Sequence, residues 1–568
     1  MRLSSAFRVS TQAGLARRCV TCLVAACMLV MGWSVRAPAG PRPVPKPMRQ
    51  QGPEFLNFEE LKALSANPYP TGAIRSKYDA LWTTPIVSNE AYKRGARPLK
   101  PSDPSLGKFL RVVTWNIEQS LHMDEAIEAF TDEEAFIRQL NPRRAKPGSR
   151  RYRKALAQRA LLEKADVILL QEMDIGVKRS GYRDAARDLA EALDMNYAYL
   201  PEYLEVDPVL LETEVIPFRE GEVDAEATAY YAVDPQRYKG LFGVAVLSRY
   251  PIVHAEGFRL FTQGYDWYWQ ERKKVSFLER LRRFGAKEVF LERLHRQMKL
   301  GGRVYFRVDL HVPDLPEQQV SIINVHLEIK CTPQKRAEQM AEVLNYIKQI
   351  PHPVILAGDI NSAPADLSPT STPRLIERNI SAPEFWASRV LEYLTPYALV
   401  VNVIRFVSNC TKNYQNPPAG HIPVLAPNRV AELFRLIERF RFDDGGAFDF
   451  RGDRRRSVGR PGTLSNSNEQ DGWAFRTTFR VNRTLFRLIG KYRLDWVFVK
   501  AYLTRPRDKQ GSYRFAPHFG RTLNAVNKYL TTRISDHDPN VVDLPLQEPP
   551  QTRHRSRGFA HAERQDWN

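Results

Sequence analysis

The chain has 568 residues, of which 43% are hydrophobic and 26% charged, a composition typical of a globular protein with ample material for a buried core. Its 40 Pro and 30 Gly follow no period, and no repeat of about 20–50 residues is present, which excludes collagen, a coiled coil, a solenoid and a propeller. The formal net charge of +20 favours polyanionic partners such as nucleic acid, phospholipid headgroups or free phosphates.

The positive charge is concentrated in three segments of the chain. Residues 1–50, 259–307 and 363–494 each carry a net charge of +8, so the remainder of the chain is slightly acidic. The basic residues therefore belong to an N-terminal leader and to two candidate insertions, and not to the whole body.

The first 39 residues have the pattern of an export signal. Residues 1–18 contain no acid and end in Arg17 and Arg18, and residues 19–35 form an uncharged, mostly apolar run. This pattern is typical of a signal peptide or an uncleaved N-terminal membrane anchor. Residues 24–27 (VAAC) also resemble a lipoprotein box, and a buried helix is a third alternative. We predict an exported protein, periplasmic or secreted, which the leader tethers to the membrane if it is not cleaved.

A Pro-rich linker and N-terminal extension, residues 40–107, follow the leader, and residues 546–568 are expected to form a disordered tail. Outside the leader the only cysteines are Cys331 and Cys410, so a zinc ribbon has no support. An oxidising compartment would permit a disulfide between these two cysteines. Two unpaired thiols are the alternative that the sequence favours.

Short strands and helices are mixed through residues 108–545. Apolar runs predict strands at 110–115, 166–170, 242–248, 304–310, 320–325, 354–357, 494–500 and 540–544. Helical spacing predicts helices at 183–193 and 334–350. Such a mixture indicates an α+β sandwich. Insertions at about 259–303 and 363–490 interrupt it.

The second insertion carries two predicted helices and a polar loop. The helices are expected at 385–407 and 428–442, and the loop, rich in Gly, Ser, Asn and Arg, at 451–470. The later helix has one apolar face, with arginines crowding the other. That face is expected to dock on the core, and the alternative is a basic amphipathic helix on a membrane surface.

Polar residues stand where the predicted strands end, and they suit metal-assisted hydrolysis of a phosphoester. Glu118, Glu172 and Asp536 offer the hard oxygen ligands that suit Mg²⁺ or Mn²⁺. Such an ion polarises a phosphoryl oxygen and stabilises charge on the leaving oxygen. Asp359 can orient or deprotonate the attacking water.

Further side chains can stabilise the phosphoryl group. Asn116 and Asn361 can donate amide hydrogens to phosphoryl oxygens or water. His326 and His537 can donate to the negatively charged transition state. Asp495 can orient His537 through its other ring nitrogen.

Six motifs in order give the chain a family resemblance. TWNIE, LLQE, NVHLE, AGDIN, RLDWVF and SDHDP follow one another at strand ends. The series resembles the endonuclease/exonuclease/phosphatase superfamily over roughly residues 108–362 and 490–545. The resemblance implies a four-layer α/β/β/α sandwich of two packed mixed sheets, with the basic helical insertions added to it. It also implies Glu172 as principal metal ligand, assisted by Glu118 and Asp536.

The resemblance implies a metal-dependent phosphoester hydrolase, and a phosphodiesterase or nuclease leads. Residues 493–496 (RLDW) resemble the nuclease and general phosphodiesterase pattern more than the Pro-Ala-Trp-x-Asp-Arg-like motif of inositol phosphatases. The basic run 138–154, and residues 265–274 with alternating aromatic and basic side chains, suit nucleic acid. The same composition suits an anionic membrane surface, and a solvated basic surface without a ligand is the third alternative.

Nucleic acid is therefore favoured over phospholipid as the partner, and no feature indicates an obligate protein partner. The alternatives are a sphingomyelinase-like phospholipid phosphodiesterase at a membrane surface, and a non-catalytic polyanion-binding protein on the same scaffold.

Overall fold

The computed structural model describes residues 46–104, 106–219, 222–223, 225–272, 297–362, 431–448, 467–471, 474–485, 489–503, 514–515 and 518–547. The predicted leader, the predicted helix at 385–407, residues 451–466 of the predicted loop and all but two residues of the predicted tail lie outside these ranges. Within them, no helix combines the length and the apolar character needed to cross a membrane.

The first sheet is mixed and has the strand order β1-β5-β8-β4-β3-β21-β20. Its strands are β1 (Ile86–Ser88), β3 (Gly107–Asn116), β4 (Val167–Ile175), β5 (Asn196–Glu205), β8 (Leu241–Ser248), β20 (Phe519–Thr522) and β21 (Asn540–Pro545), and β2 (Ser102–Asp103) and β10 (Lys299–Gly301) add to β3 and β5. Because β3 and β4 run parallel, their last residues reach the same edge of the sheet.

The second sheet has the strand order β14-β19-β13-β12-β11-β9. Its strands are β9 (Ile252–Arg259), β11 (Val304–His311), β12 (Gln319–His326), β13 (Val354–Asp359), β14 (Ala447–Phe448) and β19 (Asp495–Tyr502). β12 and β13 are parallel, and β19 runs antiparallel to β13. The ends of β12 and β13 and the start of β19 therefore lie at one rim.

The two sheets pack face to face through one apolar cluster. Val112, Leu169 and Val246 from the first sheet and Phe306 and Ile322 from the second are all buried in this cluster. Alternate residues of each strand point into it, because side chains alternate between the faces of a sheet. The outer faces of these strands are buried as well, and burial on both faces explains why the strands were predictable as compact apolar runs.

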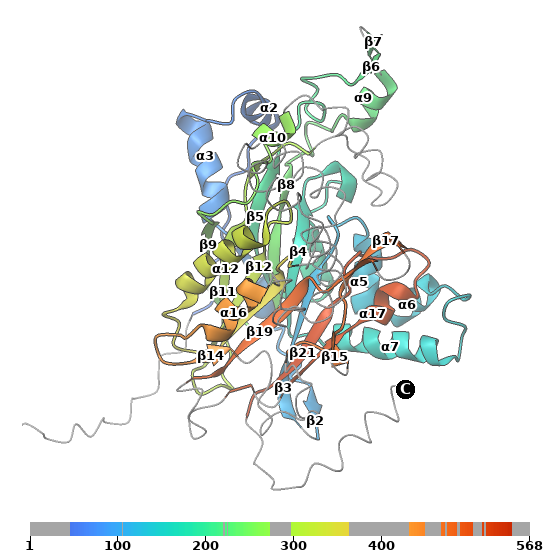
Figure 1. Ribbon diagram of the computed structural model, residues 1–568, viewed down its shortest axis with the longest axis vertical. Coiled ribbons are helices and arrows are strands. Elements are labelled where there is room, and N and C mark those ends of the chain that lie inside the picture. The colour runs from blue at the N-terminus through green and yellow to red at the C-terminus, as the bar shows by residue number, and fades with distance from the viewer. Residues whose placement is uncertain are drawn as a thin grey trace, which may run out of the picture. The chain divides into compact units, whose positions relative to one another are not determined.

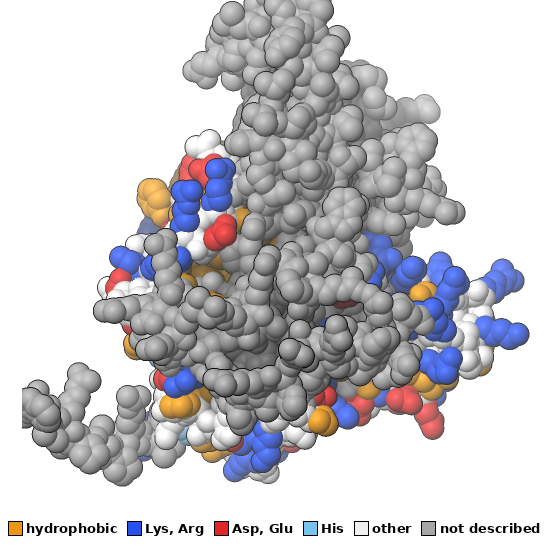
Figure 2. Space-filling model, turned by 60° about the horizontal axis from the view of Figure 1, so that its bottom comes forward, with side chains coloured by type: hydrophobic (Ala, Val, Ile, Leu, Met, Phe, Trp, Pro, Cys, Tyr) orange, Lys and Arg blue, Asp and Glu red, His pale blue; other side chains and the backbone are white. Residues whose placement is uncertain are grey.

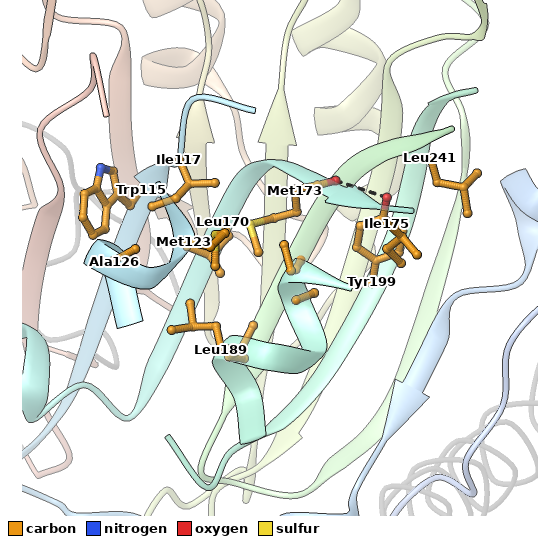
Figure 3. Packing of buried hydrophobic residues seen from close by; sticks show 14 of the residues in the cluster. Trp115, Ile117, Met123, Ala126, Leu170, Met173, Ile175, Leu189, Tyr199 and Leu241 are labelled. Carbon is orange, nitrogen blue, oxygen red and sulfur yellow. Dashed lines mark hydrogen bonds between the residues drawn. The ribbon is translucent and has the colours of Figure 1, made fainter. Parts of the chain in front are cut away.

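Helices cover the outer faces of both sheets (Figure 1). On the first sheet they are α5 (Met123–Thr131), α6 (Glu133–Gln139), α7 (Arg150–Glu163), α8 (Ala185–Ala192) and α17 (Asn524–Lys528), and on the second α12 (Pro333–Ile347) and α16 (Ala431–Arg439). Figure 3 shows Trp115 and Leu170 of the sheet against Ala126 of α5 and Leu189 of α8. In the same view the Tyr199 hydroxyl donates to the Met173 carbonyl at 3.2 Å. The predicted four-layer α/β/β/α sandwich is confirmed.

The segment predicted as linker and N-terminal extension, 40–107, contributes to this body. It forms α2 (Phe58–Ala66), α3 (Gly72–Thr83), β1, α4 (Glu90–Lys93) and β2. β1 pairs with β5, with Ile86 opposite Tyr199. Part of the extension is therefore an edge strand of the first sheet.

The remaining short elements decorate this frame. They are a 3₁₀ turn at Lys178–Ser180, β6 (Pro217–Arg219), β7 (Glu222–Val223), α9 (Ala225–Tyr231), α10 (Trp269–Arg272), β15 (Gln470–Asp471), β16 (Ala474–Phe475), β17 (Phe479–Leu485) and β18 (Ile489–Tyr492). β17 and β18 pair with each other, so the second insertion returns to β19 through a two-stranded ribbon.

The described part of the predicted helix 428–442 docks on the core. Leu433, Phe434 and Ile437 of α16 are buried with α12 and β19, and the Phe434 and Trp496 rings lie 4.6 Å apart. The docking prediction is confirmed, because this apolar face is covered by protein and is not presented to a membrane. Cys331 is buried and its thiol donates to the Glu328 carbonyl at 3.0 Å. Cys410 lies outside the described residues, so its predicted state stays a prediction.

Candidate active site

The rim of the second sheet brings three predicted site residues side by side. β12 ends in His326 and β13 ends in Asp359, whereas β19 begins with Asp495. In the ladder Asp359 lies opposite His326 on one side and opposite Asp495 on the other. All three are buried. Their spacing is therefore fixed by strand register and not by mobile loops.

The first sheet supplies two carboxylates from unusual backbone conformations. Glu172 follows Gln171, which pairs with Asn116, and it lies at a register shift in β4 with φ +62°. Glu118 lies just after β3 with φ +49°. A side chain other than Gly in the left-handed region costs of order 1 kcal/mol and clusters at functional sites. A bulge of this kind re-aims a side chain, here toward the rim.

Asn116 joins the two sheets at the rim. Its Nδ2 donates to Glu172 Oε1 at 3.1 Å and to Asp359 Oδ2 at 3.2 Å. Both amide hydrogens are thereby used to hold two carboxylates together, and Asn116 Oδ1 accepts from the Glu118 backbone amide at 3.1 Å. In the structure Asn116 thus organises the site, and its predicted contact with phosphoryl oxygens or water stays a prediction.

Asn361 is also tied to its neighbours. Its backbone amide donates to Asp359 Oδ1 at 2.8 Å, and its Nδ2 donates to the Leu327 carbonyl at 2.9 Å. Its φ of +46° turns the chain away after β13. One amide hydrogen is engaged here, and the predicted contact of the other with substrate stays a prediction.

Asp495, His537 and Asp359 form a hydrogen-bonded array. His537 Nδ1 donates to Asp495 Oδ2 at 2.8 Å, and its Nε2 lies 3.7 Å from Asp359 Oδ2. Burial opposes the charged ring, but the carboxylates of Asp495 and Asp359 outweigh it and hold the pKa of His537 well above its ordinary value. The ring is then an imidazolium whose Nε2–H faces Asp359. The predicted pairing of Asp495 with His537 is confirmed.

His326 has a carboxylate partner that sequence reasoning missed. Glu202 Oε2 lies 2.9 Å from His326 Nδ1, and Arg303 Nη1 lies 2.7 Å from that nitrogen and 3.1 Å from Glu202 Oε2. If Arg303 donates to Nδ1, the neutral ring carries its hydrogen on Nε2. If Nδ1–H donates to Glu202, Nε2 carries a hydrogen only when the ring is charged. In the first arrangement, and in the charged form of the second, Nε2–H faces Glu172 and Asp359, each 3.9 Å away.

We expect Glu202→Gln to lower kcat with little change in KM. Glu202 contacts His326 and not the substrate. The decrease in kcat should therefore be smaller than the ~10²–10⁴-fold that a whole acid–base group contributes. Steady-state kinetics at several pH values measure this. An unchanged kcat and pH profile would make Glu202 merely a buried structural charge. Glu134→Gln, on the exposed face of α6, is a suitable control for loss of one carboxylate.

Glu118, Glu172 and Asp536 form the solvent-facing side of the site. Their side chains are 24%, 21% and 21% exposed, whereas the two site histidines and Asp359 are 5% exposed or less. Burial, and then the charge of Asp536, raise the pKa of Glu118 to about 8. The pKa of Asp536 is also raised, by burial and by Glu172 and Asp359. These mutually repelling carboxylates are a suitable donor set for a cation.

The fit to a metal ion differs between two groups of side chains. Within the described part of the chain, only Asp359, Asp495 and His537 bring ligand atoms within 4.8 Å of one another. His537 is a poor ligand there, because both of its ring nitrogens carry hydrogens when the ring is charged. Mg²⁺ typically keeps several waters and uses one or two protein carboxylates. Glu172 together with Glu118 or Asp536 fits that requirement, because Mg²⁺ does not need three protein ligands.

Proton release gives a test of this donor set. A proton and a metal ion compete for Glu118, whose pKa is raised to about 8, so Mg²⁺ affinity should rise as the pH rises from about 6 to about 9. Calorimetric titration of the full chain in buffers of different ionisation enthalpy counts the protons released. Glu118→Gln should remove that release. Equal release by the variant would place the metal away from Glu118.

Residues 265–274 were predicted to offer aromatic rings for stacking on nucleic acid. This prediction is wrong for two of the rings. Trp267 and Tyr268 are buried. Trp267 Nε1 donates to Glu328 at 3.1 Å, and the Lys330 ammonium lies 3.8 Å from the centre of that ring. Trp267 packs with Phe242, whose ring lies 6.4 Å from that of His326, and the Tyr268 hydroxyl donates to the Ser65 carbonyl. Lys273 and Lys274 lie outside the described residues.

Comparisons with known proteins assign the chain to a family. A family model described as the Endonuclease/Exonuclease/phosphatase family matches residues 113–537. No curated protein matches the chain. Among solved structures, an endonuclease/exonuclease/phosphatase from Beutenbergia cavernae is 16% identical, with a TM-score of 0.29, and the match covers 77% of this chain and 71% of that chain.

Two further solved structures are similar at the same level. The human Nocturnin catalytic domain with bound sulfate is 13% identical, with a TM-score of 0.31 and coverage of 77% of this chain and 93% of that chain. A family protein from Bacteroides thetaiotaomicron is 12% identical, with a TM-score of 0.32 and coverage of 77% and 97%. Likenesses of this size carry no argument about substrate.

Proposed function

Since the chain belongs to the endonuclease/exonuclease/phosphatase family, we propose that it hydrolyses phosphodiesters and that polynucleotides are favoured over phospholipids as its substrates. Members of this family are phosphoester hydrolases that depend on a divalent metal, so the chain is an enzyme of that class. The observation that carries the proposal is the meeting of three groups at one point of the rim. Asp359 Oδ2 lies 3.9 Å from His326 Nε2 and 3.7 Å from His537 Nε2.

The metal is proposed to be Mg²⁺ or Mn²⁺, held by Glu172 with Glu118 and Asp536 assisting. When bound, such an ion polarises a phosphoryl oxygen and neutralises charge on the leaving oxygen. Asn116 holds Glu172 in place from one side, and the Gln119 backbone amide donates to Glu172 Oε2 at 3.1 Å from the other. The Glu172 carboxylate is therefore held in a fixed orientation before the metal ion binds.

The chain's own residues supply the remaining steps. Asp359 orients the attacking water and accepts its proton. His537 and His326 present N–H groups beside Asp359, and these can donate to the oxygens on which negative charge grows in the transition state. Asp495 keeps His537 charged and fixed, so the donor is in place before reaction. The site is thus organised to stabilise a phosphorane-like anion.

A specific observation keeps a phospholipid substrate as the second candidate. Phe261 is 95% exposed and Trp269 is 43% exposed, and both belong to the described part of the first insertion. Exposed aromatic side chains near basic residues suit a membrane interface. Export, proposed from residues 1–39, would give the enzyme access to such a surface. N-terminal sequencing of the mature protein tests whether the leader is removed on export.

A substrate panel tests the proposed function. The full chain is incubated with Mg²⁺ and single-stranded DNA, RNA, sphingomyelin vesicles, inositol phosphates or bis-p-nitrophenyl phosphate. We expect turnover of the polynucleotides and of the small diester, and loss of both after chelation. Turnover of sphingomyelin alone would favour the second candidate. Polynucleotide binding without turnover of any ester would indicate a non-catalytic polyanion-binding protein.

A further inference from the structure

The segment that precedes β4, the second strand of the first sheet to contribute to the site, is unusually basic. Residues 135–162 contain seven Arg, two Lys and no acidic residue. Most of these cations lie on the loop 141–149 and on the first turns of α7, which begins after the Ser149 cap. The opposite face of α7 is buried through Ala155, Gln158, Arg159 and Leu162. The helix therefore packs by one face and presents its charges on the other.

The outward cations are available to a ligand. Arg143, Lys146, Arg151 and Arg153 are exposed, and none of them forms an ion pair with a carboxylate of the described residues. Figure 2 shows Lys and Arg side chains gathered on the part of the surface where α7 lies in Figure 1. We call these four side chains the α7 basic surface. Arg159 differs from them, because it is buried and pairs with Glu133 and Glu163.

The loop that carries part of the α7 basic surface is hydrogen-bonded to the chain segment that leads to Asp536. The Asn141 amide donates to the Tyr529 carbonyl at 2.8 Å, and Arg144 Nη1 donates to the Leu530 carbonyl at 2.9 Å. Six residues further along the chain is Asp536, which is at most about 20 Å from Leu530 at ~3.3–3.6 Å per residue. That span corresponds to at most about six nucleotides of a stacked strand at ~3.4 Å of rise each. A single polyanion can therefore reach both places.

We propose that the α7 basic surface binds the sugar–phosphate backbone of a polynucleotide outside the catalytic centre, several nucleotides from the scissile bond. The proposal rests on the proposed phosphodiesterase function and adds a second contact to it. Four cations that have no acidic partner among the described residues displace counterions from the phosphates that they meet, which favours binding at low salt. Because the contact is to the backbone, it is indifferent to base sequence.

The chemistry of this surface favours a polynucleotide over a membrane. A helix that lies in a lipid interface presents large apolar side chains beside its cations. Residues 135–162, all of which are described, include no exposed large hydrophobic side chain. The exposed aromatics Phe261 and Trp269 belong to another segment. This surface therefore offers only positive charge. The phosphate backbone of a polynucleotide carries the complementary negative charge.

The test neutralises the α7 basic surface in the full chain. The variant R143Q/K146Q/R151Q/R153Q is compared with wild type on bis-p-nitrophenyl phosphate and on single-stranded DNA or RNA of increasing length up to 30 nucleotides. We expect wild-type KM to fall as the strand lengthens past about six nucleotides. The variant should lose this length dependence, with KM on the 30-mer raised about tenfold or more at low salt. Its slope of log K against log salt should shrink by about 0.7 per lost contact.

A matched variant removes four cations from the opposite rim. Lys93, Arg94, Arg97 and Lys108 lie near the start of β3 and β5, at the ends remote from the site. Their replacement by Gln, K93Q/R94Q/R97Q/K108Q, should leave the length dependence intact. Equal loss in both variants would reduce the effect to net charge and overturn the proposal.

Other outcomes separate this proposal from the proposed function. If wild type hydrolyses the small diester but its KM does not depend on strand length, the basic surface is not a polynucleotide site and the proposed chemistry stands. If wild type hydrolyses neither substrate, the proposed function itself fails. If the variant loses binding to vesicles of anionic phosphatidylglycerol and keeps its affinity for the 30-mer, the surface is a membrane contact and the proposal is overturned.

Discussion

Asp495→Asn is expected to lower kcat by roughly 10²–10⁴-fold, the scale of losing a positioned acid–base or oxyanion contact. The substitution keeps the size of the side chain and removes the charge that faces His537 Nδ1 at 2.8 Å. KM should change little, because the lost interaction is stronger in the transition state than in the ground state. Steady-state kinetics on a small diester measure both constants.

The pH dependence of the same variant has a definite sign. Asp495 and Asp359 hold the pKa of His537 above its ordinary value of 6.5, against the effect of burial. Activity that needs the charged ring is present below the raised pKa and is lost as pH rises through it. Removing one carboxylate lowers that pKa, so the alkaline limb of the pH–rate profile should move to lower pH. Stability from the same ion pair should be lost over the same alkaline range.

Two comparisons make this result interpretable. Asp79→Asn removes an exposed carboxylate that pairs with Arg75 on α3, and it should leave kcat and the alkaline limb unchanged. Thermal unfolding of Asp495→Asn shows whether the buried variant folds. A folded variant with wild-type kcat and an unmoved alkaline limb would mean that Asp495 is a structural aspartate.

Glu172→Gln should weaken the dependence on Mg²⁺ more than any other single change at the site. Gln keeps the shape of the side chain and can accept from only one of its two donors, Asn116 or the Gln119 amide, and it removes the charge. We expect the apparent Mg²⁺ affinity to fall more than about 100-fold, beyond the ~10–100-fold typical of an outer-sphere partner. Titration of activity with Mg²⁺ measures the shift.

The control for this variant is again Glu134→Gln on the exposed turn of α6. Raised Mg²⁺ should partly restore Glu172→Gln if the residue acts through the ion. A variant with wild-type Mg²⁺ affinity and turnover would remove Glu172 from the metal site and leave Glu118 and Asp536 as the remaining candidates.

The sandwich was predictable because its strands are buried on both faces. Strands such as Phe242–Ser248 and Val354–Ala357 read as unbroken apolar runs, and β8 and β13 form there. β5 was not predicted, since Asn196–Glu205 interleaves Tyr, Pro and two Glu with its apolar residues. Those glutamates are buried only because Arg179, Lys299 and Arg303 pair with them across the fold. Single-sequence periodicity does not reveal such partners.

The site was predictable from motif order, but its internal geometry was not. The pairing of Asp495 with His537 follows from residues at two strand ends, and the structure bears it out. Glu202 was missed because nothing in its local sequence connects it to His326, which is 124 residues away. The hydrogen bonds of the Asn116 and Asn361 amides within the protein were also not predictable. These amides donate to neighbouring carboxylates and carbonyls that only the folded rim brings near.

The most direct test of the account is the hydrolysis of bis-p-nitrophenyl phosphate by the full chain after removal of metal. The carboxylates of Glu118, Glu172 and Asp536 and the neighbouring Asp359 are predicted to work only with a divalent ion between them and the phosphate. We predict no turnover after chelation, and recovery when Mg²⁺ or Mn²⁺ is added in excess of the chelator. Turnover that continues unchanged in the chelated protein would contradict the account.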